Sequence, residues 1–217
     1  MSLITLIRHG QANSGATDEQ SYDRLSDLGH RQAAWLGEHL RGTGLVQARL
    51  YTGTLRRHIE TADGMAMGLE PIRDPRLNEL EYFTLSQLLA DQHGIPFPTE
   101  QSEFITHLPA VFTHWRDGKI EGAPESYDAF QSRIRDAINE IAAGATPALV
   151  VTSGGLIGNV MGQRMSLDIA ATARLTIAIF HTSLHQLFDI GGTLSPTLFN
   201  ATPHLDRADR QTARTNI

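Results

Sequence analysis

The first third of the sequence alternates short apolar runs with longer amphipathic segments. Residues 3–8 form an apolar run that stops at Gly10, and residues 48–52 form a second run. Residues 27–40 and 54–67 place apolar side chains at helical spacing, and glycines follow both segments. The order strand, helix, strand, helix is typical of a parallel sheet covered by helices. The pattern predicts an α/β protein with three layers, α/β/α, and a mostly parallel sheet.

The middle of the chain has a different character. Residues 80–122 contain helical patches that three prolines interrupt, which predicts short helices and loops. We expect this segment to be a helical insertion over one end of the sheet. The insertion is predicted to belong to a single domain that spans residues 1–217.

The last part of the chain is again regular. A strongly periodic helix is predicted over residues 127–141, followed by a buried strand at residues 148–152. Two final strands are predicted at residues 175–180 and 183–190. The polar tail from Ser195 carries no clear pattern, and no element is predicted there.

The composition restricts the classes of partner and cofactor. With 24 acidic and 18 basic residues, the formal net charge is −6, so we expect neither a nucleic-acid partner nor a membrane surface. The sequence has no cysteine, which excludes thiol nucleophiles and thiolate metal sites and fits a cytoplasmic protein. No signal peptide or membrane span is predicted. An anionic ligand therefore requires a local basic pocket, while the oligomeric state stays open.

Polar or small residues stand at four predicted strand ends. They are residues 8–10, residues 52–54, Glu79 and residues 152–155. In open α/β sheets, ligands bind outside the carboxyl ends of the strands. If the strands are parallel, the four segments meet at one crevice.

The tripeptide Arg8-His9-Gly10 is suited to phosphoryl transfer. A neutral imidazole such as that of His9 can attack phosphorus and form a phosphohistidine. Arg8 remains charged, and its planar guanidinium can bind two phosphate oxygens. Gly10 allows a close approach of the backbone. The tripeptide therefore predicts a phosphate-handling site with His9 as the nucleophile.

Five segments carry motifs in a characteristic order. They are residues 7–12, 22–29, 51–62, 77–80 and 122–133. The first resembles the RHG signature of the histidine phosphatase, or phosphoglycerate mutase-like, superfamily. The third is similar to its second motif, Y-S-S-x-L-x-R-A-x-x-T-A, and the resemblance extends over about residues 3–190.

The resemblance implies roles for further residues. It makes Arg57, rather than its neighbour Arg56, the arginine that binds phosphate, and adjacent helix residues indeed face different ways. It makes Glu79 the general acid, although Glu81 is a nearby competitor. A partly buried carboxyl can stay protonated near neutral pH.

One departure from the family pattern affects the expected activity. Where the family typically reads V-V-T-H-G-G, this chain has Ser153 in place of the histidine. Losing one such group costs about 10²–10³ in rate. The enzyme is then slow, or it binds phosphate without turnover, or another histidine fills the gap. The histidines that could take the place of the missing one are His181, His185 and His204.

The combined hypothesis is a phosphatase that hydrolyses a small phosphorylated molecule through a phosphohistidine, without metal or cofactor. Its catalytic residues are His9, Arg8, Arg57 and Glu79. The residues predicted to contact the substrate are Gly10, Gln11, Asn13 with its neighbour Ser14, Ser153 and Gly154. Backbone N–H groups at the start of a helix at Gly154 would attract an anion. A phosphoglycerate mutase-type phosphotransferase and a non-catalytic phosphate-binding regulatory protein are the alternatives.

Overall fold

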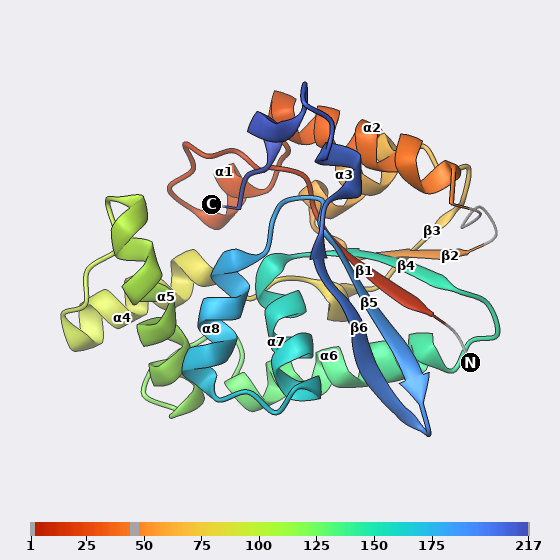
Figure 1. The fold of residues 1–217 in the computed structure, drawn as a ribbon. Coiled ribbons are helices and arrows are strands. Elements are labelled where there is room, and N and C mark those ends of the chain that lie inside the picture. The colour runs from red at the N-terminus through yellow and green to blue at the C-terminus, as the bar shows by residue number, and fades with distance from the viewer. Residues whose placement is uncertain (1–2, 44–47, 217) are drawn as a thin grey trace.

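A six-stranded mixed sheet organises the chain in the computed structural model, which describes residues 3–43 and 48–216 (Figure 1). The strands are β1 (Ile4–Arg8), β2 (Arg49–Thr52), β3 (Pro71–Arg73), β4 (Ala148–Thr152), β5 (Leu184–Ile190) and β6 (Thr193–Ala201). They are arranged in the order β3-β2-β4-β1-β5-β6. The first four pair in parallel, while β5 and β6 are antiparallel additions at one side. The carboxyl ends of β1, β2 and β4 therefore lie at the same edge.

Helices cover both faces of this sheet (Figure 1). The α-helices of the described residues are α1 (Glu19–Tyr22), α2 (Asp27–Arg41), α3 (Arg56–Met65), α4 (Tyr82–His93), α5 (Gln101–Arg116), α6 (Tyr127–Ala142), α7 (Gly154–Arg164) and α8 (Ile169–Ala178). Helices α2 and α3 lie on one face, and α6 and α7 lie on the other. The predicted three-layer α/β/α class is thus confirmed.

The two central strands are buried on both faces, which explains their continuous apolar sequences. Along β1, Ile4 and Leu6 belong to the core beneath α6 and α7, whereas Ile7 faces the core beneath α2 and α3. Strand β4 alternates in the same way, with Val150 on one side and Val151 on the other. Both strands end where this apolar pattern stops, and the polar residues that follow lie at the sheet edge.

The prediction of a strand at residues 175–180 is wrong, because most of this run belongs to helix α8. Asp168 caps the helix, and its side chain accepts a hydrogen bond from the N–H of Ala171. A short apolar run fits a strand or a buried helix equally well by its periodicity. Packing against α5 and α7 selects the helix here.

Two strands, β3 and β6, were not predicted from the sequence. Strand β6 lies in the polar tail and forms a hairpin with β5 through Gly191 and Gly192, which both have positive φ. It contains Pro196, which an edge strand tolerates because one side of its backbone needs no ladder partner. Strand β3 has only three residues, too few to produce an alternating pattern.

Residues 80–122, predicted as a helical insertion, contain α4 and α5, which lie beside α8 at one end of the molecule (Figure 1).

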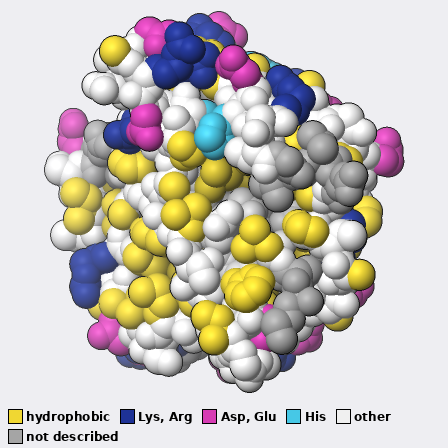
Figure 2. Space-filling model, turned by 45° about the vertical axis from the view of Figure 1, so that its right-hand side comes forward, with side chains coloured by type: hydrophobic (Ala, Val, Ile, Leu, Met, Phe, Trp, Pro, Cys, Tyr) yellow, Lys and Arg dark blue, Asp and Glu magenta, His cyan; other side chains and the backbone are white. Residues whose placement is uncertain are grey.

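None of the helices in the part of the chain that the structure describes could span a membrane. Figure 2 shows hydrophobic side chains spread over the middle of one face, with most charged side chains nearer its edge. Phe188 and Ile190 of β5 are among the exposed hydrophobic residues.

Helices α2 and α3 pack so closely at Gly37 that Gly37→Ala is expected to destabilise the protein. A Cβ atom on Gly37 would lie 1.8 Å from the carbonyl oxygen of Met65, and a backbone atom cannot swing aside. The overpacking should lower the free energy of unfolding by about 1–3 kcal/mol, even after a gain of up to about 1 kcal/mol in helix propensity. Urea denaturation measures the change. Gly15→Ala is the control, since its nearest neighbouring atom is 3.9 Å away; equal stability of both variants would contradict the expectation.

Candidate active site

His9 stands directly after β1, at the edge where the parallel strands end. Its backbone N–H donates to the carbonyl of Thr152 at the end of β4, at 2.8 Å. The ring Nδ1 lies 2.7 Å from the carbonyl oxygen of Gly10. Because a carbonyl only accepts, Nδ1 carries the proton and Nε2 keeps its lone pair. The second nitrogen of His9 is therefore in the state that a nucleophile requires.

The surroundings of His9 keep its ring uncharged. The residue is only 2% exposed, and this burial holds the pKa of His9 well below its usual value. The charges of Arg57 and Arg8 lower the pKa of His9 further. A neutral imidazole at physiological pH follows from both effects.

A cavity lies beside His9 at this edge of the sheet, and Arg57 lines it whereas Arg56 does not. Arg57 is 2% exposed and donates from Nη1 to Asp23 at 3.0 Å, whereas the side chain of Arg56 is 67% exposed and pairs with Glu60. The Arg57 guanidinium also lies 5.0 Å from the ring centre of Tyr22. These contacts hold its charge beside His9.

Arg8 is the second arginine at the cavity. Its Nη1 donates to the carbonyls of Ile179 and Asn216. In both Arg8 and Arg57, the buried Nε has no hydrogen-bond partner within the described residues. Buried donors without acceptors are costly. An anion in the cavity would supply the missing acceptors.

Glu79 follows a 3-10 turn at Pro75–Leu77 and not a strand, so its predicted place at a strand end is wrong. The turn nevertheless brings it to the same crevice. Its two carboxyl oxygens accept hydrogen bonds from the N–H groups of Gly155, at 2.8 Å, and Leu80, at 3.0 Å. Burial raises the pKa of Glu79 above its ordinary value, although both hydrogen bonds oppose that shift. Glu81, the competing carboxyl, is exposed and does not line this cavity.

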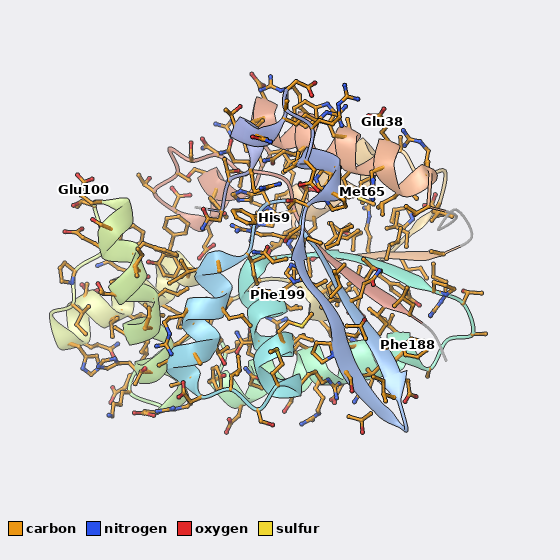
Figure 3. All side chains as sticks on the ribbon, in the orientation of Figure 1. His9, Glu38, Met65, Glu100, Phe188 and Phe199 are labelled. Atoms are coloured by element: carbon orange, nitrogen blue, oxygen red, sulfur yellow. The ribbon has the colours of Figure 1, made fainter. Side chains whose placement is uncertain are left out.

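The cavity has a volume of about 530 Å³ and contains a polar end and an aromatic end. The polar end holds His9, Arg8, Arg57, Glu79 and Gly154. The other end includes aromatic side chains from α4, α5 and the loop between them, namely Tyr82, Phe83, Phe97, Phe104 and Phe112. Tyr22 of α1 contacts the rings of both His9 and Phe83 and lies where the two ends meet. Figure 3 shows His9 near the centre of the molecule and Glu100, another lining residue, at the start of α5.

Little positive charge reaches the aromatic end. Among the described lining residues, Arg8 and Arg57 are the only arginine or lysine side chains, and both belong to the polar end. Glu19 lies on the wall and accepts a hydrogen bond from the N–H of Phe83 at 2.8 Å. Burial raises the pKa of Glu19 to about 7. The aromatic end is thus apolar to weakly anionic.

The residues predicted to contact the substrate divide into two groups. Asn13, Ser14 and Gly154 line the cavity. Gly10, Gln11 and Ser153 are not among the described lining residues. Gly10 instead permits close packing on α2, because a Cβ there would lie 2.5 Å from the carbonyl oxygen of Gly29. Gln11 is occupied by contacts with Gln32 and Ser26.

Three histidines were considered as replacements for the family histidine that is missing at residue 153, and one of them lies beside His9. The ring centre of His181 is 5.8 Å from that of His9, and its Nδ1 is bonded to the hydroxyl of Thr215 at 2.9 Å. His185 is bonded to Ser183, and His204 is bonded to Thr182; neither has a ring contact with His9 among the described residues.

A fourth histidine, His58, was not predicted to belong to the site. Its ring centre is 5.7 Å from that of His9, and its Nε2 lies 2.6 Å from the hydroxyl of Ser153. A sequence signal for it did exist, since the second motif of the family has alanine where this chain has His58. Although three imidazoles gather here, no group of residues in the described ranges could hold a metal ion.

A neutral histidine that shares a cavity with two arginines, at the carboxyl edge of an α/β sheet, is typical of a protein of the histidine phosphatase type. The model of the histidine phosphatase superfamily (branch 1) matches residues 4–200. The chain therefore belongs to this superfamily, as its motifs indicated.

Its relatives include both mutases and phosphatases. The chain is 28% identical over 192 residues to a probable phosphoglycerate mutase GpmB of Yersinia enterocolitica, with 82% of this chain and 81% of the relative covered. It is 29% identical over 162 residues to a metal-independent phosphoserine phosphatase of Arabidopsis thaliana, with 71% and 65% covered.

Solved structures share the fold at low sequence identity. The Bacillus stearothermophilus protein YhfR aligns with a TM-score of 0.68 at 23% identity, covering 94% of this chain and 99% of that one. A mycobacterial glucosyl-3-phosphoglycerate phosphatase, solved with inorganic phosphate, gives a TM-score of 0.64 at 22% identity, with 95% and 100% covered.

Proposed function

We propose that this protein hydrolyses the phosphomonoester of a small molecule through a phosphohistidine at His9. The observation that carries the proposal is the unprotonated Nε2 of a neutral His9 in a cavity shared by two arginines, whose Nε donors have no partner among the described residues. That set of groups suits a phosphoryl group better than any other anion, because nucleophile and charge stabilisation coincide.

The proposed reaction has two displacements. In the first, His9 Nε2 attacks phosphorus, the bond between phosphorus and the leaving oxygen breaks, and Glu79 gives its proton to that oxygen. In the second, water attacks the phosphohistidine, Glu79 accepts a proton from the water, and the bond from phosphorus to nitrogen breaks. Inorganic phosphate leaves, and both His9 and Glu79 return to their starting states.

Arg8 and Arg57 stabilise the phosphoryl group in both steps. Negative charge spreads over its three outer oxygens in the transition state, and fixed cations there need no reorganisation. The Asp23 contact of Arg57 and the carbonyl contacts of Arg8 hold the two guanidiniums in place. The N–H groups at the start of α7, at Gly154, add a favourable helix terminus.

The charges of the cavity favour hydrolysis of a single phosphoryl group over a mutase reaction. A phosphoglycerate carries a carboxylate besides its phosphoryl group, and a bisphosphoglycerate carries a second phosphoryl group as well. Such groups would meet Glu19, Glu100 and aromatic rings, with no further cation among the described lining residues. An apolar leaving group fits the same surface, because it would bury its area against the rings.

This charge distribution predicts a substrate preference. We expect kcat/KM for 2-phenylethyl phosphate to exceed that for 3-phosphoglycerate by about 10- to 100-fold, from apolar burial and from avoided charge repulsion. Both are esters of alkyl alcohols, so differences in leaving-group chemistry are small. Phosphate release under steady-state conditions measures the ratio. Phe83→Ser should reduce the preference, whereas a preference for 3-phosphoglycerate would argue for the mutase.

The non-catalytic alternative rests on Ser153 alone. Labelling with a phosphodonor separates it from the proposal, because a phosphate-binding protein without turnover forms no covalent adduct. Wild-type protein mixed with ³²P-labelled aryl phosphate and quenched in alkali should retain label on a histidine. Phosphate binding without adduct and without turnover would replace the proposed function with a binding role.

A further inference from the structure

His58 is a buried polar residue that the proposed reaction does not yet use. It lies on the first turn of α3, directly after Arg57, and its side chain is fully buried. Its ring faces that of His9 with 5.7 Å between the centres and 35° between the planes. His181 contacts the same ring, at 5.8 Å. The imidazole of His9 is therefore in ring contact with two other imidazoles.

The hydroxyl of Ser153 is committed to His58. Ser153 is the N-cap of α7, yet its side chain makes no capping hydrogen bond. The N-cap side chains of α2, α6 and α8, which are Ser26, Ser126 and Asp168, each accept from an N–H three residues ahead. Capping of that kind contributes about 1 kcal/mol, so an uncapped serine indicates that its bond to His58, at 2.6 Å, takes precedence.

The space around His58 is adjusted to an imidazole. A Cβ atom on Gly53 would lie 2.2 Å from His58 Nδ1, so residue 53 must lack a side chain while His58 is present. Nδ1 itself has no hydrogen-bond partner in the described part of the chain. Because only 2.6 Å separates the Ser153 hydroxyl from His58 Nε2, an imidazole extended from residue 153 in that direction would overlap the ring of His58.

We propose that His58 is a positioning residue for the reaction at His9, and that its imidazole occupies from α3 the space beside Ser153 that a histidine at residue 153 would fill. Held by its hydrogen bond with Ser153, His58 packs against the His9 ring. This contact keeps Nε2 of His9 directed at the cavity while Nδ1 of His9 stays bonded to the Gly10 carbonyl. The inference rests on the proposed function, since it assigns His58 to the same reaction.

The proposal is tested with a cycle of variants at residues 58 and 153. For H58A, which leaves a void beside His9, kcat should fall by about 10- to 100-fold with KM changed by less than about threefold. S153H alone should also lose activity, because two imidazoles compete for one space. The double variant H58A/S153H restores one imidazole, and its kcat should exceed that of H58A at least about tenfold.

His204→Ala is the matched control for a purely structural effect. His204 is also buried, its ring is bonded to one hydroxyl, and its Nδ1 has no partner within the described ranges. Thr182 keeps its second bond, to the carbonyl of His181, when His204 is removed. We expect His204→Ala to lower the melting temperature while kcat stays within about twofold of wild type.

Two results would overturn the inference: a folded H58A protein with wild-type kcat, or a double variant no faster than H58A. If H58A does not fold, H58N takes its place, and wild-type kcat in H58N is equally decisive. Orthovanadate affinity, measured by calorimetry, provides a readout without turnover and should fall at least about tenfold in H58A. If wild-type protein shows no turnover, the proposed function fails, whereas the vanadate comparison still decides the role of His58; unchanged affinity rejects it.

Discussion

His9→Ala should abolish phosphate release, with kcat falling by about 10⁴-fold or more, because His9 is the only histidine among the described residues that line the cavity. The neighbouring imidazoles of His58 and His181 are each bonded to a hydroxyl, and neither lines the cavity among the described residues. Binding of inorganic phosphate should survive, since Arg8 and Arg57 remain. Steady-state release from p-nitrophenyl phosphate and retention of ³²P label measure the two effects.

A surface histidine gives the matched comparison for His9. His30 is exposed on α2, and His30→Ala should keep wild-type rates and labelling. If His9→Ala kept its covalent label, the nucleophile would have to be a different residue. If it kept turnover within about tenfold of wild type without label, hydrolysis would proceed by direct attack of water.

Glu79→Gln should affect esters according to their leaving groups. An alkyl leaving oxygen needs a proton, so the variant should hydrolyse 2-phenylethyl phosphate about 10²- to 10⁴-fold more slowly. p-Nitrophenolate leaves without a proton, and the first displacement should remain fast with that ester. The second displacement loses its base, so the phosphohistidine should accumulate. Rapid-quench measurements with p-nitrophenyl phosphate should then show a burst approaching one equivalent.

The pH dependence of alkyl ester hydrolysis follows from the same two residues. Burial raises the pKa of Glu79, so its acid form persists to higher pH, and the rate falls as pH rises through that pKa. Burial lowers the pKa of His9, so the neutral nucleophile persists to lower pH, and the rate falls only when pH drops below that pKa. Glu79→Gln should remove the alkaline limb alone.

Glu81→Gln separates Glu79 from its neighbour. Glu81 is exposed, and its side chain accepts a hydrogen bond from the Thr84 hydroxyl, so its loss should change rates by less than about twofold. A burst in Glu81→Gln, or equal losses on alkyl and aryl esters in Glu79→Gln, would reassign the general acid.

The location of the site followed from local sequence because the ends of buried strands are visible in it. An apolar run buried on both faces must stop where the sheet stops, and Arg8 and His9 stand at that point. The difference between Arg56 and Arg57 also has a local origin, since adjacent helix residues point in different directions. In contrast, the run at residues 175–180 looked the same for helix and strand, and only contacts with distant helices selected one.

His58 is the residue of the candidate active site that the sequence did not predict. The sequence by itself determined the alternating α/β order, the edge at which polar residues meet and the presence of His9 beside Arg8, because each depends on neighbours in the chain. Only the tertiary structure decided that His58 and Ser153 share one space, that Gly53 leaves room for them and that Glu79 arrives from a 3-10 turn. Those contacts join residues up to 95 positions apart, and a one-dimensional pattern carries no information on which side chains fill a common volume.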